Sequence, residues 1–346
     1  MSIRTFKLWN RSFGWGVFSV ALITFSSTVE PTASFWDAGE YISTAAKLQV
    51  GHPPGAPLFQ MIGAFFALFS TSPENIALMV NYMSVFSSAF SVLFLFWTLT
   101  LLMKKLPVFK SLKNTLERFT FFGSASVGAL AFCFSDSFWF NAVEAEVYAM
   151  ATFILSLLFW LGLRWEQEMN TPRGDRWLLL ISFIIGLSFG VHFMGLLTIP
   201  AIGMIYYFRN TPKITLKGFL LANLISIAIL LFIFKLLLPT TLAFFGNSEV
   251  FFVNVMGLPF NSGTVIAGFC ILLFFYFSLG YTQRQKWVNI NTIILSVLFV
   301  LVGFSSWLMI PIRANANTVI NENSPADARS LLAYYNLEQY PETKLF

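Results

Sequence analysis

Charged residues are scarce in this sequence. They make up 11% of its 346 residues, against roughly 25% in an ordinary soluble domain, which argues against a soluble fold. Cysteine is scarcer still, and both Cys133 and Cys270 lie inside apolar runs, where a thiol behaves as a small hydrophobic group. The cysteines therefore indicate neither a disulfide framework nor a metal site.

Several signatures of soluble enzymes are also missing. The sequence has no GxxxxGK[ST] phosphate loop, no CxxC pair and no HExxH motif, so the common nucleotide, dithiol and zinc-protease chemistries lack their usual residues. A net charge of +5 could suggest nucleic acid as a partner, but the basic residues lie in short loops between apolar runs. A nucleic-acid-binding surface would need them gathered on one face, so no nucleic-acid partner is expected.

Apolar residues dominate instead, at 57% of the chain, with 42 phenylalanines. They form runs of about 15 to 25 residues, the length that a helix needs to cross a hydrocarbon core. The candidate runs are 13–28, 57–70, 77–103, 119–135, 148–163, 177–191, 194–208, 218–238, 263–281 and 289–310. The sequence thus predicts an all-α, multi-pass membrane protein.

The run 57–70 is too short to cross, and it follows the turn His52-Pro53-Pro54-Gly55. If it lies along the membrane interface, nine spans remain, and sixteen of the 21 basic residues fall in cytoplasmic segments, as the positive-inside rule requires. If it crossed, most of them would move outside. We therefore predict a bundle of about nine transmembrane helices with an amphipathic first outer loop, 29–76, that carries an interfacial helix at 57–70.

Acidic residues separate in the opposite sense, because twelve of the sixteen fall in the outer segments of this topology. Acid-base chemistry is therefore expected on the outer, non-cytoplasmic face. We divide the chain into a transmembrane module, 1–310, and an outer-face tail, 311–346, which could begin a soluble C-terminal domain.

The first outer loop holds the main catalytic candidates, Asp37 and Glu40. On a helix that begins near Ser34, these two carboxylates would project from the same face. A purely structural alternative makes Ser34 the N-cap and Asp37 the acid at the third helical position. His52 starts a rigid turn, because each following proline fixes its backbone, and this turn would fold 29–56 back over the membrane surface.

The second outer segment adds Glu144, Glu146 and Tyr148, at the mouth of a span where an ionisable group is costly unless it meets water or a partner. We expect Glu144 and Tyr148 to share a helical face and Glu146 to point elsewhere. His192 lies in an apolar turn on the same outer side. It could be a structural hydrogen-bonding residue, or it could hold a divalent metal together with Glu144.

Arg313 directly follows the last span. It could simply extend its side chain toward the interface, or its guanidinium could bind a phosphate group. Lys47 and Lys235 are weaker candidates for the same phosphate-binding role. These positions matter because a lipid-phosphate ligand would present its charge at this depth.

At this point the outer segments show a family likeness. WDAGEY and GHPPGAPLF, followed by NYMSVFSSAFSVLFLFW, resemble the GT-C superfamily of polyprenyl-phosphate-sugar-dependent glycosyltransferases. Within it, the likeness is to bacterial relatives of the transmembrane O-mannosyltransferase that modifies plexin-type receptors. FWFNAVEAEVYAM, GLSFGVHFMGLLTIP and PIRANANTVINEN are similar to further boxes of that family, so the resemblance runs from about 13 to 340.

The resemblance implies the inverting transfer of a hexose, by analogy mannose, from a lipid monophosphate to Ser or Thr hydroxyls of a translocated protein. It implies that Asp37 acts on the acceptor and that Glu40 is the second acid of the same box. Arg313, Lys47 or a metal at His192 would stabilise the leaving phosphate. In a bacterium the site would face the periplasm from the inner membrane, and acceptor recognition could need a soluble C-terminal domain or a partner subunit.

Two other functions fit the same sequence. A non-catalytic scaffold or accessory subunit could retain a transferase-like fold in a larger assembly, since fold does not determine function. A lipid-glycan transporter would show charged or helix-breaking positions in mid-span and repeat symmetry, and this sequence shows neither. The sugar, the acceptor and any metal requirement are not specified by the residues themselves.

Overall fold

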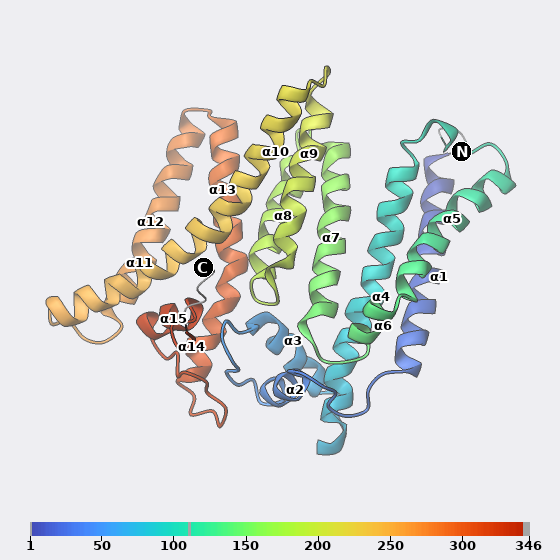
Figure 1. Cartoon of the computed structure of the whole chain (residues 1–346). Helices are drawn as coiled ribbons and strands as arrows, with labels where there is room; N and C mark the ends of the chain where they lie inside the picture. Colours follow the sequence, from blue (N-terminus) through green and yellow to red (C-terminus); the bar gives the residue numbers. More distant parts are fainter. Residues whose placement is uncertain (1, 110–111, 342–346) are drawn as a thin grey trace.

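The computed structural model describes residues 2–109 and 112–341, and these fold almost entirely into helices (Figure 1). The long helices are α1 (Ile3–Ser27), α4 (Ile76–Met103), α5 (Thr115–Cys133), α7 (Val147–Glu168), α8 (Asp175–Ser188), α9 (Thr198–Asn210), α10 (Leu216–Leu231), α11 (Leu238–Val250), α12 (Ser262–Arg284) and α13 (Val288–Phe304). The short ones are α2 (Ala38–Ala46), α3 (Pro57–Ala67), α6 (Asp136–Ala142), α14 (Met309–Ala314) and α15 (Ala328–Tyr335). In the described ranges, β-pairing amounts to one isolated bridge between Val50 and Asn321.

The connections between the helices lie at the two ends of the bundle. The N-terminus, the α4–α5 connection and the turns that join α9 to α10 and α12 to α13 lie at one end in Figure 1, while α2, α3, α14 and α15 lie at the other. The first group contains the basic loops of the sequence, and the second contains the acidic first outer loop and the tail. This arrangement gathers the candidate site residues of the first loop at one end of the fold.

The helices confirm a polytopic membrane protein but not nine spans. Five helices of the described chain are long and apolar enough to cross a membrane, and a sixth joins them if α5 and α6, bent by 70° at their junction, count as one. Of the other expected spans, α8 and α9 have only 14 and 13 residues, fewer than the roughly 20 that a full crossing needs. In α1, the polar residues Asn10, Arg11 and Ser12 directly precede the apolar run, which leaves only 13–27 of the helix for a span.

The helix that starts with α10 is longer than the sequence suggested. The expected span 218–238 continues without a loop through two π-helical segments to Val255, so that Leu216–Val255 forms 40 helical residues. The apolar run that predicts this span ends at 238, whereas the helix continues past Pro239, a residue type that usually breaks a helix. The wider π turn at Phe232–Leu237 ends two residues before this proline, and in membrane helices such local adjustments re-satisfy the backbone groups that a proline leaves without a partner.

The short helix α3 covers 57–67 of the expected interfacial run 57–70 and ends near Leu68. With 11 residues it reaches about 16 Å, half of a hydrocarbon core. Its first turn is anchored where the backbone amides of Leu58 and Phe59 donate to the carbonyl of Gly190, at 2.7 and 3.1 Å. The helix therefore lies against the turn between α8 and α9.

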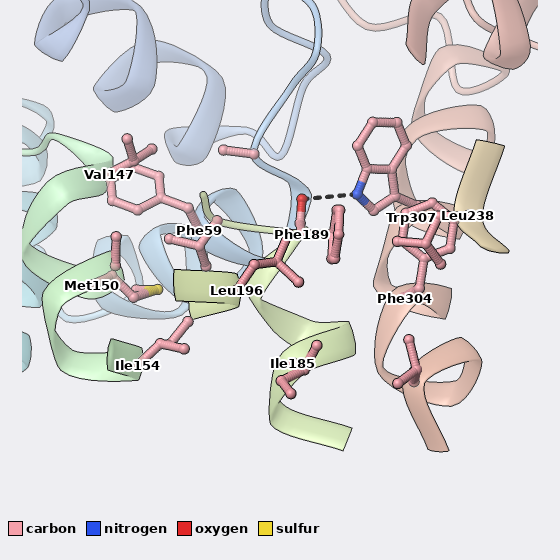
Figure 2. Close-up of a cluster of buried hydrophobic side chains, with 14 of the residues drawn as sticks. Phe59, Val147, Met150, Ile154, Ile185, Phe189, Leu196, Leu238, Phe304 and Trp307 are labelled. Atoms are coloured by element: carbon pink, nitrogen blue, oxygen red, sulfur yellow. Dashed lines mark hydrogen bonds between the residues drawn. The ribbon is translucent and has the colours of Figure 1, made fainter. Parts of the chain in front are cut away.

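Two apolar clusters hold the helices together. One packs α1 against α4, α5 and α6. The other joins α2, α3, α7, α8, α9, α13 and the tail, and part of it is shown in Figure 2, where Phe59, Val147 and Trp307 lie within it. Trp307 satisfies its buried indole N–H by donating to the carbonyl of Phe189 at 3.0 Å. This second cluster forms the floor beneath the outer loops.

Helices α8 and α13 cross at two glycines. A Cβ atom on Gly186 would lie 2.0 Å from the carbonyl oxygen of Val300, and one on Gly303 would lie 2.3 Å from that of Phe183. Backbones can approach this closely only where the side chain is a hydrogen atom, which is the usual role of small residues between membrane helices. The crossing fixes α13, and with it the tail, relative to the centre of the bundle.

The tail packs against the first outer loop. The amide of Val50 donates to the carbonyl of Ile320, and the amide of Glu322 donates to the carbonyl of Val50. The hydroxyl of Tyr334, which is 1% exposed, donates to the carbonyl of Gly51 at 2.6 Å. Up to residue 341, the tail is therefore part of the structure around the candidate site.

Candidate active site in the outer loops

Asp37 stands at the start of α2, with its carboxylate 58% exposed. We expected the helix to begin near Ser34, but it begins at Ala38. Asp37 occupies the N-cap position and its side chain makes no capping hydrogen bond. The alternative in which Ser34 caps the helix and Asp37 is its third residue is therefore wrong. The carboxylate of Asp37 is left open to solvent or a ligand.

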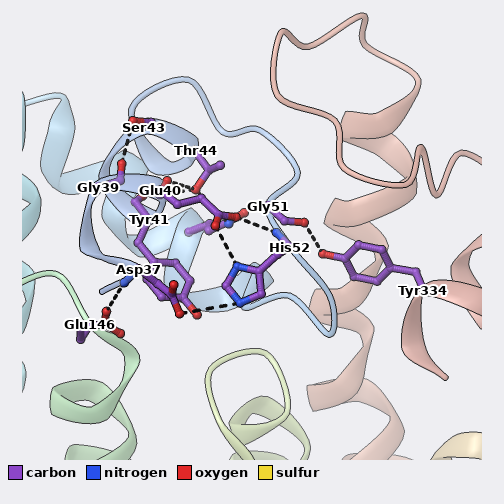
Figure 3. Close-up of polar contacts among 11 residues, drawn as sticks. Asp37, Gly39, Glu40, Tyr41, Ser43, Thr44, Gly51, His52, Glu146 and Tyr334 are labelled. Carbon is purple, nitrogen blue, oxygen red and sulfur yellow. Dashed lines mark hydrogen bonds and ion pairs between the residues drawn. The ribbon is translucent and has the colours of Figure 1, made fainter. Parts of the chain in front are cut away.

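Glu40 lies in the first turn of α2 and holds His52. Its carboxylate accepts the backbone amide of His52 at 2.7 Å and contacts the ring Nδ1 at 2.9 Å (Figure 3). These two hydrogen bonds stabilise the charged forms of both groups. They lower the pKa of Glu40, and the side-chain bond to Glu40 raises the pKa of His52.

The other ring nitrogen of His52, Nε2, lies 4.0 Å from a carboxylate oxygen of Asp37. The imidazole therefore stands between two carboxylates that are three residues apart in the sequence. Figure 3 shows the ring between the two acids, with Tyr41 beside them. The structure thus brings together three of the residues that the sequence singled out.

Glu144 and Glu146 approach the same loop from the segment before α7. Both are buried, with 3% and 5% exposed surface. Glu144 accepts the hydroxyl of Ser34, and Glu146 accepts the backbone amide of Asp37 at 3.0 Å. Our expectation that only Glu144 would share a helical face with Tyr148 was wrong, because α7 begins at Val147 and both glutamates precede it.

Burial alters the protonation of these two acids, because water stabilises a carboxylate better than a protein interior does. Desolvation raises the pKa of Glu144. For Glu146, desolvation and then the charge of Asp37 raise the pKa to about 7. Glu146 can therefore hold or release a proton near neutral pH, which is the range in which acid-base groups of enzymes operate.

Tyr148 and His192 form the edge of the site near α7. Their ring centroids are 5.6 Å apart, and Nδ1 of His192 accepts the backbone amide of Met194 at 3.2 Å. Burial lowers the pKa of His192. Within 2–109 and 112–341, no group of three or more His, Cys, Asp or Glu side chains is arranged to hold a metal ion. A metal held by His192 and Glu144 stays a prediction.

Arg313 and Lys47 lie at the far end of α2. Arg313 donates to the carbonyls of Leu48 and Lys47, and so contacts the backbone that ends the helix. Lys47 itself is exposed at the C-cap. Because α2 rises about 1.5 Å per residue, this end is about 15 Å along the helix from Asp37. The phosphate-binding role of both residues stays a prediction.

Two tyrosines at the site were not predicted from the sequence. Tyr41 lies 6.0 Å from the ring of His52 between centroids, and burial raises its pKa. Its position four residues after Asp37 was a usable signal, since residues at that spacing share a helical face. Tyr334 is 283 residues from its partner Gly51, and no local pattern links them.

The sequence also contains a pattern that is typical of a nucleophilic serine. Residues 186–190 spell GxSxG, which in some hydrolases exposes a nucleophilic serine on a sharp turn. Here Ser188 ends α8, has no exposed surface, and donates its hydroxyl to the carbonyl of Ile185 at 2.7 Å. This serine is a buried helix residue and not a nucleophile.

With the geometry in place, the family can be assigned. Residues 37–215, just over half of the 346, match the family described as the N-terminal domain of the protein O-mannosyl-transferase TMEM260. The chain belongs to this family. The matched region of the TMEM260 N-terminal domain begins at Asp37 and includes Glu40, His52, both glutamates and His192, whereas Arg313 and the tail lie outside it.

Two curated relatives are each similar to about half of the chain. One is the protein O-mannosyl-transferase tmem260 of Dictyostelium discoideum, 25% identical over 162 residues, which are 46% of this chain and 18% of that protein. The other is the protein O-mannosyl-transferase TMEM260 of Mus musculus, 28% identical over 176 residues, which are 50% of this chain and 22% of that protein. The alignments thus span about a fifth of each relative's length. No solved structure matches the chain.

An apolar cavity of about 400 Å³ lies below the site, between α3, α4, α7 and α8. On α7 it is lined by Met150, Phe153, Ile154 and Leu157. Met150 is one helical turn beyond Glu146, and Leu157 is about 16 Å deeper than Glu146. This member of the TMEM260 N-terminal family therefore combines an acidic site with an apolar cavity whose lining on α7 begins one turn beyond Glu146.

Proposed function

We propose that this protein is a membrane glycosyltransferase that transfers a hexose to Ser or Thr hydroxyls of proteins. Mannose is the sugar that the names of the two relatives suggest. The observation that carries the proposal is the exposed carboxylate of Asp37 among Glu40, His52 and Glu146, within a region that matches a transferase family. In a bacterium, the site would face the periplasm from the inner membrane.

In the proposed reaction, the oxygen of the acceptor hydroxyl attacks the anomeric carbon of the sugar. The bond between that carbon and the phosphate oxygen breaks, and the lipid phosphate leaves with the bonding electrons. The hydroxyl proton passes to the carboxylate of Asp37, which acts as general base. Exposure favours Asp37 for this role over the buried Glu144 and Glu146, because a base must reach the proton that it removes.

The donor would be a polyprenyl-phosphate sugar. The cavity below the site supports this choice, since its lining is almost entirely apolar and begins one turn below Glu146. Part of an isoprenoid chain could lie there while the phosphate and sugar stay near the outer carboxylates. A phosphate anion needs a cation nearby, and Arg313, Lys47 or a metal at His192 are the candidates from the sequence.

Reconstitution of the purified chain in lipid nanodiscs tests the proposal. The assay supplies a radiolabelled mannosyl-phosphoryl-polyprenol and a Ser/Thr-rich peptide, and it measures label in the peptide. We expect time-dependent transfer, with release of the polyprenyl phosphate in equal amount. Donor binding without transfer to any Ser/Thr peptide would instead favour the scaffold alternative, in which a partner subunit carries the chemistry.

A further inference from the structure

His52 is held from several sides. Its backbone amide and its ring Nδ1 both contact the carboxylate of Glu40, and its carbonyl accepts the amide of Gly55 at 2.9 Å. The preceding residue, Gly51, passes so close to Glu40 that a Cβ atom there would lie 2.6 Å from the carboxylate oxygen. The hydroxyl of Tyr334 fixes the carbonyl of Gly51 from the tail. The ring is thus placed by the fold and not by chance rotation.

We propose that His52 is a positioning residue, whose imidazole bridges Glu40 to Asp37 and so keeps the carboxylate of Asp37 in place for the acceptor hydroxyl. The inference rests on the proposed function, in which Asp37 takes the acceptor's proton. Its basis is geometric, because Nδ1 lies 2.9 Å from Glu40 and Nε2 lies 4.0 Å from Asp37 on the opposite side of the ring.

The charges around the ring favour its protonated form. Glu40 and Asp37 flank it from the first loop, and Glu322 of the tail adds a third negative charge. The neutral phenols of Tyr41 and Tyr334 are the other titratable groups nearby, and burial raises the pKa of both. Together these contacts give His52 a raised pKa, so the imidazolium is the form that can donate to Glu40 while its charge attracts the carboxylate of Asp37.

The chain offers an unusually clean test of this bridge, because His52 and His192 are its only histidines. Protein labelled with ¹⁵N-histidine gives two sets of imidazole nitrogen signals by NMR, one for each ring, and His192→Gln assigns them. We expect His52 to titrate above its ordinary range and His192 below it, as their contacts require. Asp37→Asn should lower the pKa of His52, whereas Asp136→Asn, which removes an exposed carboxylate of α6, should leave it unchanged.

A pKa of His52 that does not move in Asp37→Asn would overturn the bridge, because the ring would then not sense the carboxylate. This experiment needs no transfer activity, so its failure differs from failure of the proposed function. Asp37 is more than half exposed, so we expect its asparagine variant to fold.

The second arm measures transfer in nanodiscs against pH, with the mannosyl-phosphoryl-polyprenol and peptide described above. Wild-type transfer should fall as pH rises through the pKa of His52, because the imidazolium is lost. His52→Gln should reduce kcat by about 10- to 100-fold, as expected for a misplaced catalytic group, with little change in donor KM, and should lose this alkaline fall. The same alkaline fall in wild type and His52→Gln would also overturn the proposal.

Discussion

The buried carboxyl group of Glu146 should make the stability of the protein depend on pH, by an amount that follows from its pKa. Its carboxyl is 5% exposed, and its pKa is raised from 4.5 to about 7. The folded protein therefore holds a proton that the unfolded chain releases between these two values, so stability falls as pH rises through that window. From pH 5 to pH 8 the loss is about 2 to 3 kcal/mol. Glu146→Gln keeps the shape and an acceptor oxygen for Asp37 but cannot ionise, so it should lack this loss.

The measurement is the free energy of SDS-induced unfolding in mixed micelles at pH 5 and pH 8. The quantity of interest is the stability of Glu146→Gln minus that of wild type, which should be about 2 to 3 kcal/mol more favourable at pH 8 than at pH 5. Asp136→Asn, at an exposed position, serves as the control and should show no such change. An equal difference at both pH values would refute the reasoning, because Glu146 would then ionise alike in the folded and unfolded states.

Substitutions at three further positions probe the fold, the tail and donor binding. Tyr334→Phe removes the buried hydroxyl that binds the first outer loop and should lower the unfolding free energy by about 1 to 3 kcal/mol, while the exposed Tyr340→Phe should not. Gly186→Ala places a Cβ atom 2.0 Å from a carbonyl of α13 and should destabilise by about 3 kcal/mol, whereas Gly280→Ala, with open space around it, should be tolerated in the same assay. Arg313→Lys should weaken the binding of a labelled polyprenyl-phosphate sugar, and Arg313→Ala should weaken it further. Unchanged donor affinity in both would leave Arg313 as the residue that holds the end of α2.

Local patterns in the sequence were enough to predict several residues of the candidate site. The three-residue spacing of Asp37 and Glu40 and the rigid turn at His52 act within one short segment, so residue chemistry and turn geometry were enough to single them out. The acidity of the outer segments likewise pointed to Glu144 and Glu146. Local patterns could not predict which of these residues contact one another, because Glu146 accepts a hydrogen bond from the backbone amide of Asp37, 109 residues away in the sequence.

Other features were hidden for identifiable physical reasons. The hydroxyl of Tyr334 reaches Gly51 through tertiary packing alone, and its residue type gave no hint of a partner. The apolar run 218–238 predicted a span that stops at 238, yet the helix continues past Pro239, with a π segment just upstream. Charge and position made Arg313 a phosphate candidate, but its guanidinium also binds carbonyls at the end of α2, which only the fold could reveal.

The most direct test of the account is transfer by Asp37→Asn protein in the nanodisc assay. Asparagine keeps the size of the side chain but cannot accept the acceptor's proton. Because general bases contribute about 10²- to 10⁴-fold, transfer should fall by about that factor while donor binding persists and Asp136→Asn stays active. Near-normal transfer by Asp37→Asn would contradict the assignment of Asp37 as the base.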